Sequence, residues 1–203
     1  MAYRRTPSVD ARRAATRDRV LGVTRELLAE SGYAGCSIAA VAKRAGVAAG
    51  SVYLHFPTKA DLLAEAFRLV VRHEVEAVAQ AVLAAPDHRA GVIAVVETFA
   101  GRALKAPRLA YALLAEPIDA AVERERLRFR IAFRDIVAEV LDRAVRDGEL
   151  PPQNPAVTAA ALVGAVGEVL VGPLAAGHAT PDTIPNLISF CLRAIGVDDA
   201  VHP

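Results

Sequence analysis

The side chains best suited to bind another molecule lie in the stretch Ser37–Lys59. Tyr53 carries an O–H donor and His55 carries an N–H donor, and both groups can bind a phosphate oxygen. The apolar Val52 and Phe56 lie beside them and are expected to face a protein core. The stretch is therefore a candidate for contact with phosphate groups, such as those along a nucleic acid backbone.

Two short helices are predicted around these donors. Ser37 can cap a helix with apolar residues at helical spacing, and Gly46 can end it. A second helix is predicted from Ala49 to Phe56, before Pro57. Two helices joined by such a tight turn form a helix-turn-helix, whose second helix can enter a major groove about 12 Å wide. The positions expected to face outward are Ala48, Ala49, Gly50, Ser51, Tyr53, Leu54 and His55. On these residues alone, a generic helical hairpin remains the alternative.

Charge is distributed unevenly along the chain. Residues 1–72 contain 12 Lys or Arg and 6 Asp or Glu, whereas residues 73–203 contain 12 and 17, so the net charges are +6 and −5. A basic first third on an acidic remainder indicates that only the N-terminal part meets a polyanion. A solvated basic face is the simpler alternative reading.

The composition predicts an all-α fold. Ala, Val and Leu supply most of the 54% hydrophobic content, and aromatic residues make up only 5%. Capping residues, Gly, Pro and apolar spacing predict about nine helices, near residues 8–32, 37–46, 49–56, 58–85, 87–105, 108–115, 119–147, 154–176 and 182–195. We expect a basic arm over residues 1–10, a helix-turn-helix domain over 11–60 and a larger helical domain over 61–203.

The N-terminal stretch resembles a known family. The matching motifs include Ala45-Gly46-Val47, Gly50-Ser51-Val52-Tyr53, His55-Phe56 and Lys59-Ala60-Asp61-Leu62-Leu63. This pattern resembles the DNA-binding domain of TetR-family transcriptional regulators and extends over about residues 16–66. The resemblance implies a homodimer that binds palindromic double-stranded DNA and releases it when a small-molecule effector occupies the C-terminal domain. It also implies repression as the usual outcome.

The resemblance also assigns roles to individual residues. Ser37 resembles the helix-capping hydroxyl that meets a phosphate, and Lys59 resembles a phosphate-binding lysine. Tyr53 and His55 resemble a pair that clamps the DNA backbone. The base-facing positions are held by Ala49, Gly50, Ser51 and Leu54.

The recognition helix departs from the family pattern in two ways. Ala48 stands where Ser or Thr is frequent, so this helix lacks a side-chain N-cap. Leu54 replaces a residue that is usually polar or aromatic, which leaves Ser51 as the one strong polar reader. Leu54 or an Ala methyl can contact thymine methyl groups. We hypothesise that specificity also depends on DNA shape and on Arg4 and Arg5, which can enter a minor groove.

The larger domain is expected to contain a ligand pocket between the fourth helix and residues 87–147. Its candidate apolar wall residues are Phe99, Leu104, Tyr111, Leu114, Phe129 and Phe133, and its candidate polar groups are Glu97, Arg102, Glu116, Arg126 and Arg130. Such walls suit a hydrophobic molecule of drug or lipid size. Two competing interpretations remain. The aromatic residues can belong to an ordinary hydrophobic core, and the arginines can lie on a solvated helix face.

The last two predicted helices are expected to form a dimer interface. Their apolar residues include Leu162, Val166, Val169, Leu170, Leu187 and Phe190. Two such helices from each subunit would form a four-helix contact, as the resemblance implies. The alternative is a single core within one chain. Residues 156–176 have Glu168 as their only charge, and we interpret them as an interface helix rather than a membrane span.

Enzymatic chemistry is not expected. The five His residues form no metal-ligand pattern, Cys36 and Cys191 form no Cys-x-x-Cys pair, and no nucleophile motif or phosphate-binding Gly loop occurs. We therefore predict no cofactor, no metal and no membrane contact. With no signal peptide at the N-terminus, a cytoplasmic location is predicted. The alternatives are a helical ligand-binding protein that has lost specific DNA binding and, less favoured, an enzyme that uses the helical cavity. A redox role for Cys36 is also conceivable.

Overall fold

The structure, a computed structural model, describes residues 7–197, and it describes side chains from Asp10 onward. Within this range it consists of nine helices and no strands, which confirms the all-α prediction. The helices are α1 (Pro7–Gly35), α2 (Ile38–Ala45), α3 (Ala49–Tyr53), α4 (Lys59–Leu83), α5 (His88–Lys105), α6 (Pro107–Leu114), α7 (Ala120–Arg146), α8 (Pro155–Ala176) and α9 (Thr183–Ala194).

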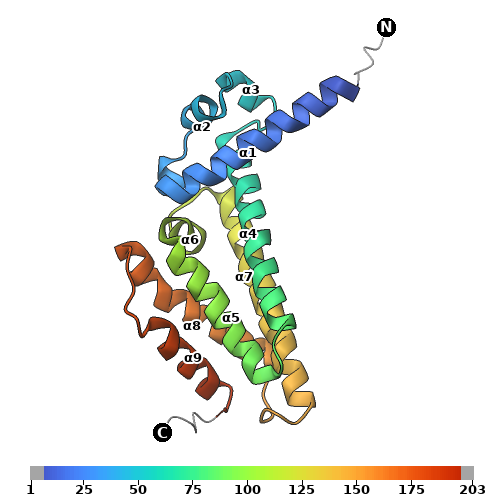
Figure 1. Ribbon diagram of the computed structural model, residues 1–203, viewed down its shortest axis with the longest axis vertical. Coiled ribbons are helices and arrows are strands. Elements are labelled where there is room, and N and C mark those ends of the chain that lie inside the picture. The colour runs from blue at the N-terminus through green and yellow to red at the C-terminus, as the bar shows by residue number, and fades with distance from the viewer. Residues whose placement is uncertain (1–6, 198–203) are drawn as a thin grey trace.

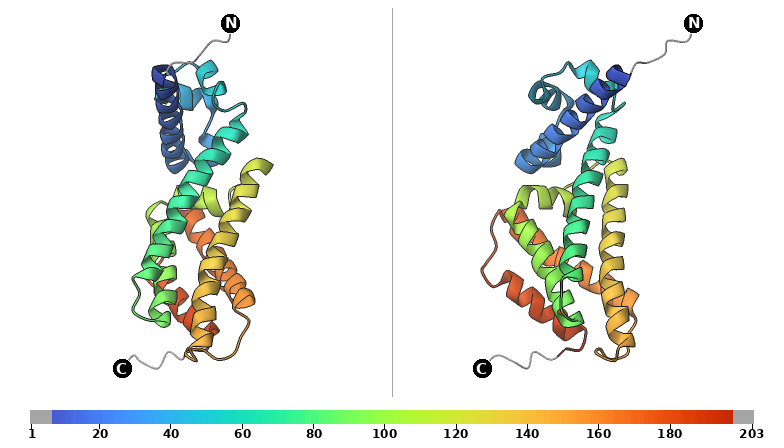
Figure 2. Two further views of the ribbon diagram at one scale, coloured as in Figure 1. Left: turned by 90° about the vertical axis from the view of Figure 1, so that its right-hand side faces the viewer. Right: turned by 45° about the vertical axis from the view of Figure 1, so that its right-hand side comes forward.

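The molecule is elongated, with two helical parts at opposite ends (Figure 1). Helices α1, α2 and α3 form the N-terminal unit, and α5, α8 and α9 lie in the other part. Helix α4 leaves the N-terminal unit and runs beside α7 along the length of the molecule, as both views in Figure 2 show. Helix α6 lies between the two parts and contacts both α1 and α8. Helix α4 corresponds to the helix predicted near residues 58–85.

Local capping explains the helices of the N-terminal unit. The Ser37 hydroxyl accepts the N–H of Ala40 at 3.1 Å, and Gly46 ends α2 in the left-handed region at φ 66°. Helix α3 has no side-chain cap at Ala48, as expected. It is shorter than predicted, because turn-type hydrogen bonds rather than regular helix carry the chain to Phe56. Thr58 then caps α4 in a reciprocal capping box with Asp61.

Separate hydrophobic clusters stabilise the two ends. The first joins α1, α2, α3 and the start of α4 through fully buried residues such as Val20, Val52 and Leu62, and it extends to Leu113 and Val122. The second joins α5, α7, α8 and α9. A small third cluster packs Val78 of α4 against phenylalanines of α7. The long α4–α7 pair therefore belongs to more than one core, which couples the two ends mechanically.

The C-terminal end of α1 is attached to the segment between α6 and α7. Gly32 interrupts α1 with φ 66° and ψ −169°, a conformation open essentially to glycine alone. This turn directs the next two backbone N–H groups at Glu116, whose carboxylate accepts the N–H of Tyr33 at 2.8 Å and that of Ala34 at 3.0 Å. The Tyr33 hydroxyl also hydrogen-bonds the carboxylate of Asp119. We call this set of contacts the α1 joint.

Two glycine substitutions separate local strain from damage to the α1 joint. A Cβ at Gly46 would meet no atom within 4 Å, so Gly46→Ala should lower the free energy of unfolding by about 1–2 kcal/mol through its positive φ alone. A Cβ at Gly32 would lie 2.8 Å from Oε2 of Glu116. In Gly32→Ala, backbone strain and steric overlap therefore add, and we expect the free energy of unfolding to fall by about 3 kcal/mol. Urea unfolding of both variants measures the two changes in free energy. If the two changes were equal, the α1 joint would contribute nothing beyond local backbone strain.

Candidate DNA-binding surface and ligand cavity

The outward face of the helix-turn-helix is exposed. Tyr53 and Leu54 are 51% and 72% exposed, while Val52 and Phe56 are buried against the other helices. Ala48, Ala49 and Gly50 are also exposed, and Ser51 and His55 are half-buried. The structure thus brings the seven predicted outward positions onto the open side of the N-terminal unit. They offer few polar groups, so α3 presents a small and largely apolar surface.

Two arginines of α1, which the sequence analysis did not single out, lie beside the end of the recognition helix. The Arg13 guanidinium donates to the carbonyl of Leu54 at 3.2 Å. Arg17 lies 5.2 Å from the ring centre of Phe56 and pairs with Glu65 at 3.1 Å. Their spacing of four residues on α1 indicates that they share one face of the helix. That this face lies beside α3 depends on the tertiary structure and could not be predicted from the spacing. They add positive charge beside Tyr53 and His55.

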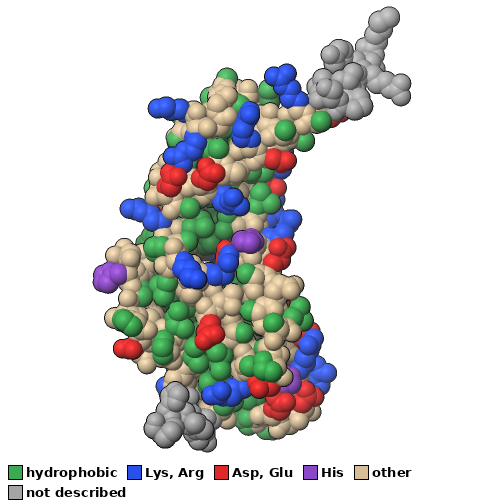
Figure 3. Space-filling model, in the orientation of Figure 1, with side chains coloured by type: hydrophobic (Ala, Val, Ile, Leu, Met, Phe, Trp, Pro, Cys, Tyr) green, Lys and Arg blue, Asp and Glu red, His purple; other side chains and the backbone are tan. Residues whose placement is uncertain are grey.

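The surroundings of His55 favour its neutral form. Its pKa is lowered from the usual value of 6.5, first by burial and then by the charges of Arg13 and Arg17. The neutral ring still has one N–H, so it can donate a hydrogen bond to a phosphate without supplying charge. Lysine and arginine must therefore provide the electrostatic attraction at this surface. Figure 3 shows such side chains spread over the N-terminal unit.

Ser37 and Lys59 both have roles within the fold. The Ser37 hydroxyl accepts a backbone N–H as the α2 cap, and its own proton is free for another acceptor. The Lys59 ammonium lies 5.0 Å from the ring centre of Tyr33 at the start of α4. Arg4 and Arg5, predicted to enter a minor groove, lie outside the described residues.

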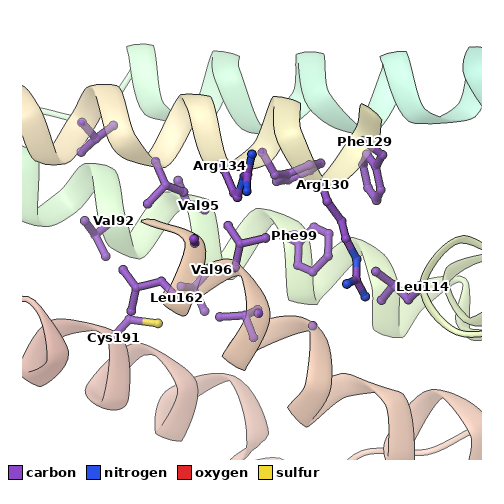
Figure 4. A pocket seen from close by; sticks show the side chains of 18 residues that line it. Val92, Val95, Val96, Phe99, Leu114, Phe129, Arg130, Arg134, Leu162 and Cys191 are labelled. Carbon is purple, nitrogen blue, oxygen red and sulfur yellow. The ribbon is translucent and has the colours of Figure 1, made fainter. Parts of the chain in front are cut away.

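A cavity of about 220 Å³ lies in the C-terminal part (Figure 4). It is lined by Val92, Val95, Val96, Phe99, Leu114, Phe129, Arg130, Phe133, Arg134, Val137, Val140, Ala160, Leu162, Val163, Gly164, Val166, Gly167 and Cys191. These residues come mainly from α5, α7 and α8. The rings of Phe99 and Phe129 each meet the ring of Phe133 edge-on, with centroids 4.9 and 4.7 Å apart. The cavity is therefore almost wholly apolar, apart from two arginines.

Five predicted ligand residues lie on the wall of this cavity: Phe99, Leu114, Phe129, Arg130 and Phe133. This cavity differs from the predicted location in one respect, because α8 rather than α4 completes it. Val78 of α4 packs directly against Phe129 and Phe133, and no residue of α4 lines this cavity. The sequence analysis missed Arg134, Cys191, and the valines and small residues of α5 and α8. Their contribution depends on how α8 crosses α7.

Six other predicted ligand residues are not part of the cavity wall: Glu97, Arg102, Leu104, Tyr111, Glu116 and Arg126. Arg102 instead makes a bidentate ion pair with Glu74 of α4, at 2.6 and 2.8 Å. Leu104 and Tyr111 pack against the C-terminal core, and Glu97 is exposed. Glu116 belongs to the α1 joint. Arg102 also lines a separate, smaller cavity of about 30 Å³. Helix periodicity does not distinguish a cavity face from faces that pack between helices, so it could not separate these six residues from the five on the wall.

Arg126 has a structural role at the end of α6. Its buried guanidinium donates to the carbonyls of Leu113, Ala112 and Glu116 at 3.0, 3.1 and 2.6 Å, and it pairs with Glu123 at 2.9 Å. Burial is the main cause of its lowered pKa. A cation at these carbonyls satisfies the C-terminal end of α6 and favours its dipole. Arg126 therefore fixes the segment that carries Glu116.

The predicted dimer residues divide into two groups. Leu162, Val166, Leu170 and Leu187 are buried within the subunit's own core, so they cannot contact a partner, and these four predictions are corrected. Val169 and Phe190 are 49% and 43% exposed. The open side of α8 carries Val157, Ala161, Glu168 and Gly172 at helical spacing. Hydrophobic side chains gather over α8 and α9 in Figure 3.

By length and composition alone, α8 is the one helix among the described residues that could cross a membrane, and 28% of its most apolar window is buried. One side of it packs on α7 and α6, and Glu168 lies on the open side. These features suit a helix with one face in the subunit core and the other in a protein contact.

Neither cysteine is suited to redox sensing. Cys36 and Cys191 are both buried, and burial raises the pKa of each thiol to about 11. The thiolate is the form that reacts with oxidants, and at neutral pH both groups are thiols. Cys36 therefore acts as a small apolar residue of the N-terminal core.

Comparison with known proteins identifies the N-terminal unit. Residues 20–66 match the family model described as bacterial regulatory proteins, tetR family. The N-terminal unit is therefore similar to the DNA-binding domain of that family. An HTH-type transcriptional regulator of Mycobacterium tuberculosis, Rv2912c, is 36% identical over 78 residues, which are 38% of this chain and 40% of that protein. The chain thus matches less than half the length of this curated relative.

Two further likenesses extend into the C-terminal part. The transcriptional repressor KstR2 of Rhodococcus jostii is 28% identical over 136 residues, which are 65% of this chain and 66% of that protein. The crystal structure of FadR from Bacillus subtilis in complex with stearoyl-CoA superposes with a TM-score of 0.75 and 18% identity, and the match covers 91% of this chain and 99% of that chain. At that identity the second likeness establishes the fold.

Tyr53→Phe tests the exposed surface without disturbing the core. Because the ring is half exposed, we expect the free energy of unfolding to change by less than about 0.5 kcal/mol. Loss of one hydroxyl contact should weaken DNA binding roughly fivefold. Fluorescence anisotropy on a selected DNA site and urea unfolding check the two values. Ser37→Ala is the contrasting control, since it should lower both the free energy of unfolding and the affinity for DNA. Unchanged DNA affinity in Tyr53→Phe would remove Tyr53 from the interface.

Proposed function

We propose that the protein is a homodimeric transcriptional repressor that a small apolar ligand releases from a palindromic DNA site. The observation that carries the proposal is the TetR-type helix-turn-helix at residues 20–66, whose outward face is exposed. Regulators of this family bind DNA and small-molecule effectors and act as dimers. In this assignment residues 11–60 bind DNA and residues 61–203 bind the ligand and the partner subunit. Residues 7–10 of the predicted basic arm belong to α1. Such a protein acts in the cytoplasm.

In the proposed complex, α3 enters the major groove and the residues around it bind the DNA backbone. Tyr53 and His55 donate to phosphates from the end of α3, and Ser37 and Lys59 do so from the starts of α2 and α4. Arg13 and Arg17 bring charge to the same side. These contacts position the helix, whereas base selection depends on the small exposed surface of α3.

The second subunit is proposed to pack on the open faces of α8 and α9. Val157, Val169 and Phe190 are large apolar side chains that α8 and α9 leave exposed in the single chain. A two-fold contact through these faces buries them and places two recognition helices on one side of the dimer. Half-sites about 34 Å apart, one turn of DNA, then follow from the two-fold symmetry.

Ligand release is proposed to pass through the end of α6. Leu114, the last residue of α6, lines the cavity, and Glu116 two residues later holds the N–H groups of Tyr33 and Ala34. A ligand that displaces Leu114 therefore shifts the attachment of α1 to the C-terminal part. The stearoyl-CoA bound in the FadR structure, which has a similar fold, supports a ligand with a long apolar chain.

A helical ligand-binding protein without specific DNA binding is the second candidate. The observation in its favour is the poor set of base-facing groups, since Ala48, Ala49 and Gly50 offer no side-chain hydrogen bond. Steep salt dependence of DNA affinity separates the two candidates, because only a DNA-binding surface releases counterions on binding.

The test is selection of binding sites from a random duplex pool, followed by salt titration of the recovered site. We expect a palindrome bound by two subunits. With about six or more phosphate contacts, affinity should fall on the order of a thousandfold between 50 and 200 mM salt. Failure to recover any site at low salt would refute the DNA-binding assignment and favour the second candidate.

Leu54 is expected to read thymine through its methyl group. Replacing a contacted thymine by deoxyuridine removes one methyl, which should weaken wild-type binding roughly fourfold. The same replacement should have no effect on the Leu54→Ala variant, which has already lost the contact. Anisotropy titrations of both proteins on both DNAs complete the cycle. A deoxyuridine penalty that persists in Leu54→Ala would assign the methyl contact to another residue.

A further inference from the structure

The wall of the cavity combines apolar residues with positive charge alone. Its eighteen lining residues include Arg130 and Arg134 and no acidic side chain. Valine, leucine, alanine, glycine and three phenylalanines make up nearly all of the rest. An apolar cavity needs no cation for its own stability, so apolar packing does not explain the two arginines on its wall.

The two arginines also differ from most other arginines of α7, although exposed Arg124, which does not line the cavity, likewise has no ion pair among the described residues. Arg128, Arg143 and Arg146 each have an acidic partner three or four residues away on the same helix. No ion pair or hydrogen bond joins Arg130 or Arg134 to any residue in the described part of the chain. The sequence offers Arg130 no acidic partner on its own helix, because the residues three and four positions away are Leu127, Phe133 and two further arginines.

Arg126, Arg130 and Arg134 form a row at intervals of four residues. Side chains at this spacing are neighbours on a helix surface, and like charges there destabilise the helix. The pKa of Arg126 is lowered mainly by burial, and the charge of Arg130 lowers it further. Repulsion along the row therefore has an electrostatic cost, which an anion at Arg130 and Arg134 would offset.

The guanidinium of Arg130 is positioned to meet a ligand. Figure 4 shows its side chain leaving α7, passing Phe99 and ending beside Leu114, at one end of the apolar cavity. Arg134 lies one turn further along the same helix and also lines the cavity. Both side chains are exposed at the α7 edge, where a charged head group can keep part of its hydration.

We propose that the cavity binds an organic anion with an apolar body, whose acid group pairs with Arg130 and Arg134 while its body fills the space between α5, α7 and α8. The inference rests on the proposed ligand-binding function and specifies the ligand class. A guanidinium matches a carboxylate or a phosphate through two parallel hydrogen bonds, so both head groups share the required chemistry. A volume of about 220 Å³ suits a single acyl chain of moderate length or a small aromatic acid.

Calorimetric titration of the full-length protein with three probes of equal chain length tests the proposal. Decanoate and decyl phosphate carry the two head groups, and 1-decanol has the same tail without charge. We expect at least one anion to bind roughly ten- to a hundredfold more tightly than the alcohol, the range for charge-assisted hydrogen bonds. The preferred anion distinguishes a carboxylate ligand from a phosphate ligand.

Substitutions on α7 assign the effect to the two arginines. Arg130→Gln/Arg134→Gln should reduce anion affinity to that of decanol and leave decanol affinity unchanged. Arg124→Gln is the control for position, because it removes one positive charge from an exposed position of α7 that does not line the cavity. It should bind all three probes as the wild type does. Arg130→Lys/Arg134→Lys, which keeps the charge, should retain part of the anion preference.

The inference fails if decanol binds as tightly as both anions, if no probe binds at millimolar concentration, or if the double Gln variant keeps the anion preference. These titrations contain no DNA, so they are independent of the helix-turn-helix. Anion binding to a protein that fails site selection would retain the ligand class and refute the repressor. Site-specific DNA binding without anion preference would support the DNA-binding function and refute the proposed ligand class.

Discussion

The attachment of α1 to Glu116 is the contact on which the two parts of this protein depend. One carboxylate holds two successive backbone N–H groups, at Tyr33 and Ala34, and the turn that presents them exists because Gly32 adopts a conformation barred to other residues. Arg126 in turn holds the carbonyls at the end of α6. Charged groups therefore fix both sides of the junction, and hydrogen bonds to charged groups are stronger and more directional than apolar packing.

Helix α7 uses its arginines in three physically different ways. Arg126 is buried and satisfies backbone carbonyls, whereas Arg128 pairs with Glu125, which itself pairs with Arg68 of α4 at 2.9 Å. Arg130 and Arg134 face the cavity without partners among the described residues. The same side chain thus acts as a helix cap, an interhelical bridge or a proposed ligand-binding group, and its surroundings rather than its identity decide which.

The cavity exists because the facing helices supply small side chains. Ala160, Gly164 and Gly167 of α8 lie opposite the phenylalanines of α7, and small residues leave unfilled space where larger ones would close it. The same glycine-rich and alanine-rich helix has an open outer side. Helix α8 therefore contributes to the ligand cavity with one face and to the proposed subunit contact with another, so the two properties constrain each other's sequence.

The sequence by itself determined the helices and the DNA-binding unit. Ser37, Gly46 and Thr58 act through local hydrogen bonds and backbone conformation, so their effect is readable from neighbouring residues. The wall residues Phe99, Phe129 and Phe133 were also identifiable, because few aromatic residues compete for the core. The apolar stripes of α8 and α9 were visible as well, but a stripe does not show which helix it meets.

Only the tertiary structure decided which face of each stripe met the subunit's own core. Leu162 and Leu170 turned out to be internal, while Val169 and Phe190 remain exposed. It also decided that Arg102 and Glu116 bridge helices and that Arg134 reaches the cavity. The physical reason is that helical periodicity fixes which residues share a face, whereas the partner of that face depends on helices distant in the sequence.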